Sequence, residues 1–447
     1  MKTNNFLCNL FIAVCLFGQI SAATLASEHT VITYIAGDNN LDAYGDFNMN
    51  DMSIGVASTK GIKVLVQRDK QKDNKTWRYE IIPGGKVDAG SLSTEMGYNP
   101  ATELVNCMQW AVKNYPAKNY TLVLWNHGSG IEDFYPGSTK NIFLQSRWLN
   151  LTPSSLERGI LYDDSQGTCL TNQGLTSALT QIKQIIGKNL DVIAMDACLM
   201  AMVEVAYQMK GLVNTFVGSQ QTIPGTGFPY SMFLNPLSLN PAGITPVQLA
   251  KSMVSSYGTY YKYQAPTPDF TLSAIDVTSI DLIKQNIDLF IKAVAACSKI
   301  DATKTKNIML AARKASISFE MPEYIDLYSF YTNILNQTKK SSPKSAIILD
   351  KLNKARPRQK PTHTSTSTTT TSSTAYQAAL TTLNAVIQDG LAKIGQVVLQ
   401  KVAGSVYSGT KGISIYYPIS GQIDPSYPQT IFAQSTAWTQ FIKLYHS

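Results

Sequence analysis

One histidine and one cysteine are the residues of this chain whose types and positions could support nucleophilic catalysis. His127 lies in the run Trp125-Asn-His-Gly-Ser-Gly130, and Cys198 closes the run Asp196-Ala-Cys198. The chain has four histidines, and the other three lie beside the start of the expected mature chain, in a Ser/Thr tract and at the penultimate position: His29, His363 and His446. An imidazole base working near neutral pH would therefore be His127, with the Cys198 thiol as its nucleophile.

Both residues directly follow short, mainly apolar segments, 122–125 and 191–195, that are typical of buried strands. Parallel strands end at one edge of a sheet, so His127 and Cys198 are expected to meet there, although they are 71 positions apart (198 − 127). A helix expected over 199–210 would place Cys198 at its N-terminus, where the helix dipole favours a thiolate. The amides of Gly128 and Cys198 are expected to bind the oxyanion of a tetrahedral intermediate.

Each of these residues also has an ordinary structural explanation. Cys198 could be an inert buried cysteine, and His127 a hydrogen-bonded loop histidine. Their joint placement, each just after the carboxyl end of a strand, favours catalysis.

Asp196 would be costly to bury without a cation, and a substrate Arg or Lys side chain could be that cation. The alternative for Asp196 is a helix N-cap, a position that also favours aspartate.

The elements that must position these residues alternate between strand-like and helix-like segments from 29 to 235, which indicates a parallel sheet covered on both faces. After 236 the pattern becomes mainly helical, with one strand at 271–277. Thr245 is expected to cap a helix that starts at Pro246. A basic segment and a Ser/Thr run, together 356–374, predict a flexible loop. The expected elements beyond it are a helix at 376–394, strands at 396–402 and 413–417, and a final helix.

Composition excludes several classes of protein. The chain is 44% hydrophobic and 15% charged, so it can fold around a large core. Its net charge of +8 contains no basic block interleaved with aromatics, so nucleic-acid binding is not expected. There is no CxxC pair for a zinc site and no G-x-S-x-G motif for a serine esterase.

Residues 1–23 have the features of a secretory signal peptide, and no later stretch is apolar enough to span a membrane, which predicts a secreted protein.

Four blocks of sequence resemble the clostripain family of cysteine peptidases. The blocks are Tyr34-Ile-Ala-Gly-Asp-Asn-Asn-Leu41, Leu124-Trp-Asn-His-Gly-Ser-Gly130, Met195-Asp-Ala-Cys-Leu-Met-Ala-Met-Val-Glu204 and Gly218-Ser-Gln-Gln-Thr-Ile-Pro-Gly225. A fifth, Gly412-Ile-Ser-Ile-Tyr-Tyr-Pro418, is similar to a segment near the family's end. The resemblance implies the α/β fold of caspases, legumains and gingipains over 29–235. The region 236–447 would be a mainly helical extension that returns strands and a final helix.

The resemblance also implies roles for individual residues. His127 and Cys198 would be the catalytic dyad, and Asp196 would lie in the S1 pocket and select Arg or Lys. Gly218 and Ser219 would lie beside that pocket. The first strand end carries Asp38 and Asn39, for which a substrate-binding role and a turn role are both open.

Further expectations concern processing, metal, partners, oligomeric state and alternative functions. Some family members cleave themselves between the histidine and cysteine blocks, where this chain offers Lys140, Arg147 and Arg158, with cleavage after one of the two arginines as the hypothesis. Calcium is a cofactor of some members, but no loop here has the spacing of an EF-hand and no metal ligand is predicted.

The expected partners are peptides or proteins with Arg or Lys at P1, and the protein is expected to be a monomer. The alternatives are an Asn- or Asp-specific peptidase and an inactive binding or adhesion protein.

Overall fold

A nine-stranded sheet lies at the centre of the computed structural model, which describes residues 26–71, 73–133, 159–340 and 368–446. The strand order is β12-β10-β9-β8-β5-β1-β2-β3-β4, and the five inner strands from β9 to β2 are parallel to one another. Antiparallel strands extend both edges. The strands are β1 (Ser27–Ile35), β2 (Ile62–Lys70), β3 (Asp73–Ile82), β4 (Gly85–Leu92), β5 (Ala117–Trp125), β8 (Leu190–Asp196), β9 (Val213–Gly218), β10 (Thr271–Asp276) and β12 (Val398–Ala403).

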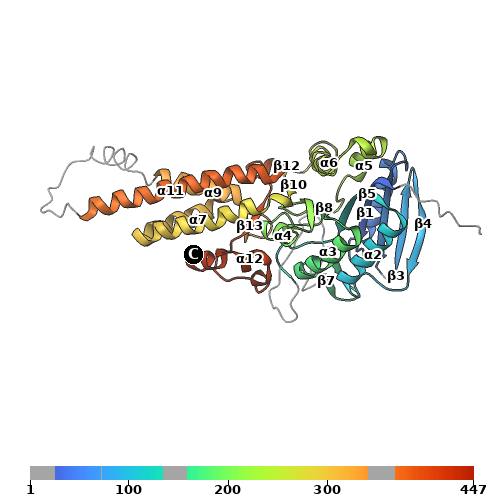
Figure 1. Ribbon diagram of the computed structural model, residues 1–447, viewed down its shortest axis with the longest axis horizontal. Coiled ribbons are helices and arrows are strands. Elements are labelled where there is room, and N and C mark those ends of the chain that lie inside the picture. Colours follow the sequence, from blue (N-terminus) through green and yellow to red (C-terminus); the bar gives the residue numbers. More distant parts are fainter. Residues whose placement is uncertain (1–25, 72, 134–158, 341–367, 447) are drawn as a thin grey trace, which may run out of the picture.

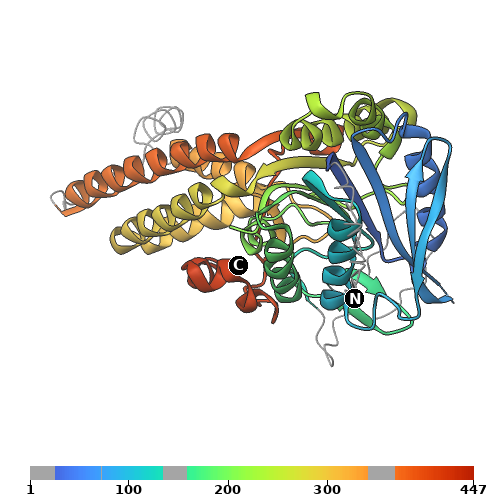
Figure 2. The same ribbon diagram turned by 45° about the vertical axis from the view of Figure 1, so that its right-hand side comes forward.

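Helices cover both faces of this sheet, as Figures 1 and 2 show. Alternate residues of β1 pack into different cores: Val31 and Ile35 into one, Ile32 and Tyr34 into the other. The first core is closed by α1 (Asp42–Gly55), α5 (Tyr230–Leu239) and α6 (Pro246–Thr259). Over the sheet, the second core is covered by α2 (Pro100–Asn114), α3 (Asn172–Ile186) and α4 (Val203–Gln208). The inner strands are therefore buried on both sides, which explains their nearly continuous apolar sequence.

The second half of the chain completes the sheet and then leaves it. Strands β10 and β12 both lie beyond residue 236 and extend the sheet past β9. The long helices α7, α9 and α11 pack together and project away from the sheet (Figure 1). The helices of this half are α7 (Asp281–Ile300), α8 (Ala302–Ala315), α9 (Leu327–Lys340), α11 (Thr368–Val397), α12 (Ile431–Ser435) and α13 (Trp438–Leu444). Two small sheets pair β6 (Ile160–Asp163) with β7 (Thr168–Leu170), and β11 (Tyr324–Asp326) with β13 (Ser414–Tyr416).

The predicted α/β class, with a mostly parallel sheet flanked by helices, is confirmed. The cap at Thr245 is confirmed too: its hydroxyl accepts the Gln248 amide, and the Gln248 side chain accepts the Thr245 amide. Two details differ from the prediction. The Ser/Thr tract is helical from Thr368 onward, because α11 begins there, and the helix predicted to begin at Leu199 begins only at Val203. Residues 1–23, the expected signal peptide, lie outside the described residues.

None of the described helices combines the length and the apolar character that crossing a membrane requires.

Candidate active site

The pairing of β5 with β8 places His127 and Cys198 on neighbouring loops. The two strands are parallel, and Trp125 lies opposite Asp196. His127 and Cys198 each lie two residues past that pair, and the Asn126 amide donates to the Asp196 carbonyl at 3.3 Å. A Cβ built on Gly128 would lie only 2.6 Å from the Cys198 carbonyl oxygen, so the two backbones touch where only glycine fits. The register of the sheet thus brings the predicted base and nucleophile to one edge.

Cys198 does not lie at a helix N-terminus, which corrects the expectation from sequence. The Leu199 amide donates to the Gln221 carbonyl at 3.2 Å, and the Ala201 amide donates to the Ser219 carbonyl at 2.8 Å. These bonds hold the chain in a turn instead of a helix after Cys198, and helix α4 starts five residues beyond it. Leu199 is buried with φ of 65°, a left-handed conformation that costs energy in a residue with a branched side chain. Such strain is characteristic of functional sites.

The ionisation of both groups is set mainly by the loss of water around them. Burial raises the pKa of the Cys198 thiol to about 11; the Ile223 amide, which donates to Sγ at 3.3 Å, opposes this shift. Burial lowers the pKa of His127 to about 4, against the attraction of Asp164. These shifts favour a neutral thiol and a neutral imidazole at pH 7, and Cys198 lacks the helix dipole that was expected from sequence to stabilise a thiolate.

The side chain of Asn40 orients the imidazole. His127 Nε2 lies 2.7 Å from Asn40 Oδ1, and since that oxygen can only accept, Nε2 carries the proton. Nδ1 of the neutral ring is then left as the base. The ring of Tyr162 meets the imidazole edge-on, with centroids 6.0 Å apart. The sequence analysis assigned no role to Asn40; its signal is an exposed amide at the carboxyl end of β1, next to the strand that carries His127.

Asp196 is a buried carboxylate held by a distant segment. It is 4% exposed, and its Oδ2 accepts from the Phe228 amide and from the Tyr230 hydroxyl, both at 2.9 Å. Within the described residues no Lys or Arg forms an ion pair with it. Burial raises the pKa of Asp196 to about 7, although both hydrogen bonds oppose this. Gly227, with φ of +67°, approaches so closely that a Cβ there would lie 2.7 Å from Oδ2.

One segment contacts both the nucleophile and this carboxylate. The Ile223 amide contacts Cys198 Sγ, and five residues later the Phe228 amide contacts Asp196. Gly218 and Ser219 begin this segment at the end of β9. The Ser219 hydroxyl is fully buried, donates to the Gln221 carbonyl at 2.7 Å and shares a 2.9 Å hydrogen bond with Thr271. That hydroxyl is thus engaged within the protein, and the contacts to the reacting groups come from further along the segment.

The other residues singled out from sequence have different surroundings. Asn39 is buried, and its amide donates to the carbonyls of Ala36 and Tyr162 at 3.2 and 2.9 Å. Asp38 is buried, with a carboxylate oxygen within 4.8 Å of oxygens of Glu95 and Asp163. The cleavage candidates lie outside the described residues: Lys140, Arg147 and Arg158.

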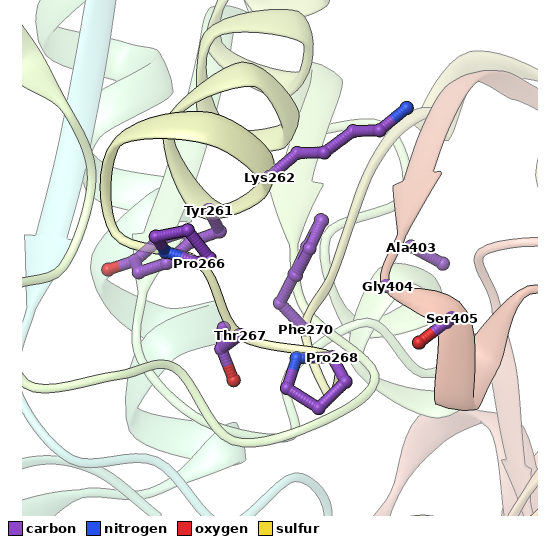
Figure 3. Close-up of a pocket in the computed structure, with 9 residues that line it drawn as sticks. All are labelled: Tyr261, Lys262, Pro266, Thr267, Pro268, Phe270, Ala403, Gly404 and Ser405. Carbon is purple, nitrogen blue, oxygen red and sulfur yellow. The ribbon is translucent and has the colours of Figure 1, made fainter.

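A hollow of about 420 Å³ opens between the end of α6 and the segment after β12 (Figure 3). Its walls include Phe270, Pro268 and Lys262, with Gly404 and Ser405 opposite them. None of the predicted site residues lines it, but the hydroxyl of Tyr261 in its wall donates to the carbonyl of Gly227, which packs against Asp196.

Comparison with known proteins identifies the family. Residues 33–444 match the model of the clostripain family, Peptidase_C11. The chain belongs to the clostripain family. It is 23% identical over 234 residues to clostripain of Hathewaya histolytica, an alignment that spans 45% of this chain and 40% of that relative's length.

Two solved structures of clostripain-family proteins share the fold. One is a secreted C11 cysteine protease from Bacteroides thetaiotaomicron in complex with an irreversible peptide inhibitor, with a TM-score of 0.58 at 18% identity over 92% of this chain and 99% of that one. The other is an inactive zymogen of a C11 protease from Parabacteroides distasonis, with a TM-score of 0.52 at 18% identity over 94% of this chain and 99% of that one. The match covers nearly all of both chains, so the helical second half belongs to the shared fold.

Within this clostripain-family site, the contact from Asn40 to His127 yields a prediction. Asn40→Ala should lower kcat by about 10- to 100-fold with little change in KM, because a mispositioned base costs that much without altering substrate contacts. Asn40→Asp keeps an acceptor oxygen and should restore most of the activity. Steady-state kinetics would measure both. Asn50, an exposed residue of α1, gives a matched control as Asn50→Ala. Equal kcat values in Asn40→Ala and that control would contradict the orienting role.

Proposed function

We propose that this clostripain-family chain is a secreted cysteine endopeptidase that cleaves after Arg, with Lys as a second P1 residue. The parallel register of β5 and β8, which puts His127 and Cys198 on touching loops, is the single observation that supports it best. The left-handed backbone of Leu199, directly after Cys198, adds support. Strained backbone of this kind is found mostly at active sites and binding sites, where the surrounding structure enforces it.

In the proposed mechanism His127 acts first as a base. Its Nδ1 removes the Cys198 proton as Sγ attacks the substrate carbonyl, so the neutral resting pair becomes reactive only when substrate is bound. The amides of Gly128 and Cys198 would donate to the developing oxyanion. The imidazolium then protonates the leaving amine, and water activated by the same ring hydrolyses the acyl-enzyme. Asn40 accepts from Nε2 throughout and holds the ring in the reacting orientation.

The proposed P1 preference rests on the electrostatics of Asp196. A carboxylate that is 4% exposed and has no cationic partner among the described residues is unfavourable as an anion. A guanidinium or ammonium group entering beside it would supply the missing charge and satisfy Oδ1, since Oδ2 already accepts two hydrogen bonds. An acidic P1 side chain would be repelled, which argues against Asp specificity.

A panel of fluorogenic peptides that differ only in the P1 residue tests this proposal. We expect hydrolysis after Arg, slower hydrolysis after Lys, and none after Asn or Asp. Preferred cleavage after Asn or Asp would overturn the specificity. If no peptide is cleaved, the alternative of an inactive binding protein on the same fold becomes the better explanation.

Export, self-cleavage and a monomeric state are further parts of the proposal. The sequence between the histidine block and β6 carries Lys140, Arg147 and Arg158, and a protease selective for basic residues could cut its own chain there. N-terminal sequencing of purified active protein should reveal a second chain that starts after Arg147 or Arg158. A single intact chain with full activity would exclude self-cleavage as a requirement.

The raised pKa of Cys198 predicts how the free enzyme reacts with alkylating agents. Only the thiolate reacts, so with a pKa of about 11 the rate at Cys198 should rise about tenfold per pH unit from pH 6 to 9. The measurement is iodoacetamide labelling followed by mass spectrometry of the Cys198 peptide, with Cys297 as a buried thiol for comparison. A rate that stays level across this range would show instead that the resting enzyme holds a thiolate.

A further inference from the structure

The hollow beside α6 lies at the same edge of the sheet as the proposed catalytic pair. Strand β10 runs antiparallel to β9, so its first residue, Thr271, lies at the edge where β8 and β9 end. Strand β12 is antiparallel to β10 and pairs Ala403 with Thr271, which brings its last residue to this edge too. The walls of the hollow come from the segments beside these two residues: residues from 266 to 270 precede β10, and 403–405 lie at the end of β12. The hollow and Cys198 therefore lie along one edge of the sheet.

Direct contacts connect the hollow to the segment after β9 that contacts the proposed nucleophile and the buried carboxylate. The Tyr261 hydroxyl, in the wall of the hollow, donates to the Gly227 carbonyl at 2.8 Å. Gly227 in turn lies against Asp196, where a Cβ would come within 2.7 Å of Oδ2. On the side of β10, the Thr271 hydroxyl accepts the Gln221 amide at 3.0 Å. The hollow and the proposed S1 pocket thus share one supporting segment.

The order of the strands places the hollow on the acyl side of the proposed nucleophile. His127 follows β5 and Cys198 follows β8, whereas the hollow lies past β9, at the ends of β10 and β12. In the proposed mechanism the His127 imidazole protonates the leaving amine, so that amine lies on the β5 side of Cys198. The residues on the acyl side of the scissile bond, P1 and those before it, then extend in the opposite direction. That direction leads across β9 toward the hollow.

The spacing of the strands sets which substrate residue reaches the hollow. Neighbouring strands are about 4.8 Å apart, so a point between β10 and β12 is roughly 12 Å from β8. An extended peptide advances about 3.3 Å per residue, which places P3 and P4 roughly 7 and 10 Å before P1. Their side chains cover the remaining distance. P2 lies too close to the scissile bond to enter the hollow.

The walls of the hollow suit an apolar side chain. Tyr261 and Phe270 are 1% and 3% exposed with ring centroids 6.0 Å apart, and two prolines of the segment before β10 extend this apolar lining. In Figure 3 Phe270 lies between Tyr261 on one side and the end of β12 on the other. The cation among the lining residues is Lys262, whose Nζ lies 5.2 Å from the ring centroid of Tyr263, a residue outside the lining. A volume of about 420 Å³ is within the range of pockets that bind small organic groups.

We propose that this hollow is the subsite for an aromatic or branched apolar side chain at P3 or P4 of the substrate. The inference rests on the proposed function, because the roles of His127 and Cys198 set the direction of the peptide. Burying such a side chain, instead of leaving it in water, should raise kcat/KM for the peptide by about tenfold or more. A peptide with Arg at P1 and only small residues before it would use the S1 pocket alone.

Peptides that differ only at P3 or P4 test the subsite with the full chain. The set consists of acetyl-Phe-Ala-Ala-Arg, acetyl-Ala-Phe-Ala-Arg and acetyl-Ala-Ala-Ala-Arg, all with the same fluorogenic leaving group, and of the versions with Asp in place of Phe. We expect at least one Phe peptide to exceed the all-alanine peptide in kcat/KM by about tenfold or more. Equal kcat/KM values across the set, or a preference for Asp over Phe, would overturn the proposal.

Variants that fill the hollow give a sharper comparison. Ser405 is exposed and lies in the wall, so Ser405→Trp should block the hollow without disturbing the core. It should remove the advantage of the Phe peptide and leave both the all-alanine peptide and the alkylation rate of Cys198 unchanged. Thr267→Trp, in the segment before β10, provides a second block if the first variant fails to fold.

The matched control for these variants is Ser91→Trp. Ser91 is an exposed serine of β4, the strand at the opposite edge of the sheet. That variant should keep the full advantage of the Phe peptide. A folded Ser405→Trp or Thr267→Trp protein that also keeps it would contradict the assignment of the hollow.

Binding to an inactive chain separates this proposal from the proposed function. With Cys198→Ala protein, calorimetry should show a Phe peptide binding about tenfold or more tightly than the all-alanine peptide, and adding Ser405→Trp should remove the difference. If the peptides bind in this way but the parent cleaves none, the subsite stands and the enzymatic function falls. If Arg peptides are cleaved with no preference at P3 or P4, only the subsite falls. If none is bound or cleaved, both fall.

Discussion

Replacing Cys198 by alanine should abolish cleavage of peptides with Arg at P1, lowering kcat by at least about 10⁴-fold. The reason is that the acyl-enzyme cannot form without Sγ, and the remaining oxyanion donors and binding contacts supply only residual rate enhancement. Fold and stability should be preserved, because Cys198 is only partly buried and alanine leaves its backbone contacts intact. The measurements are progress curves on the Arg peptide together with circular dichroism and thermal melting.

The matched control for this prediction is Cys297→Ala. Cys297 is a buried thiol in α7, in the helical half of the molecule and outside the site. That variant should retain activity even if the small cavity lowers its stability somewhat. Cleavage by purified Cys198→Ala protein at more than a trace of the parent rate would contradict the assignment of the nucleophile. Loss of activity in both variants would indicate damage to the fold instead.

The second large effect is expected at Asp196. Asp196→Asn should lower kcat/KM for Arg peptides by about 10²- to 10³-fold, or roughly 3–4 kcal/mol, because it removes the charge that would face the guanidinium in a buried site. Asparagine keeps an acceptor for the Phe228 amide and the Tyr230 hydroxyl, so the pocket should keep its shape. Alkylation of Cys198 by iodoacetamide, which involves no P1 side chain, should be affected far less and serves as the internal control.

The pH dependence of Arg cleavage adds an independent check on Asp196. Burial raises the pKa of this carboxyl to about 7, so in the free enzyme it is largely protonated below that pH and charged above it. A cationic side chain prefers the charged form, and kcat/KM for Arg peptides should therefore rise as pH increases through about 7. The Asn variant should lack this component of the profile. Identical pH profiles for parent and variant would contradict the role of Asp196 as the charge in the pocket.

Local sequence determined the positions of the principal elements and of the proposed base and nucleophile. Apolar runs of four or five residues are sufficient to mark β5 and β8, because strands buried on both faces cannot carry charged side chains in their interior. His127 and Cys198 directly follow these runs, so their meeting at one edge depended only on the strands being neighbours. The start of α6 was equally local, since Thr245 and Pro246 suit the first positions of a helix by their own chemistry.

Contacts between distant segments decided what the sequence could not. Leu199 and Ala201 look helical from their neighbours, but their amides pair with carbonyls some twenty residues later, so no helix forms there and Cys198 lacks a helix dipole. Asn40 acquires a role only because β1 pairs with β5, which brings its amide to His127. Asp38, Glu95 and Asp163 lie far apart in the sequence and become one cluster only in the folded protein. Hydrogen-bond partners and buried charge depend on through-space neighbours, and a sequence pattern records only neighbours along the chain.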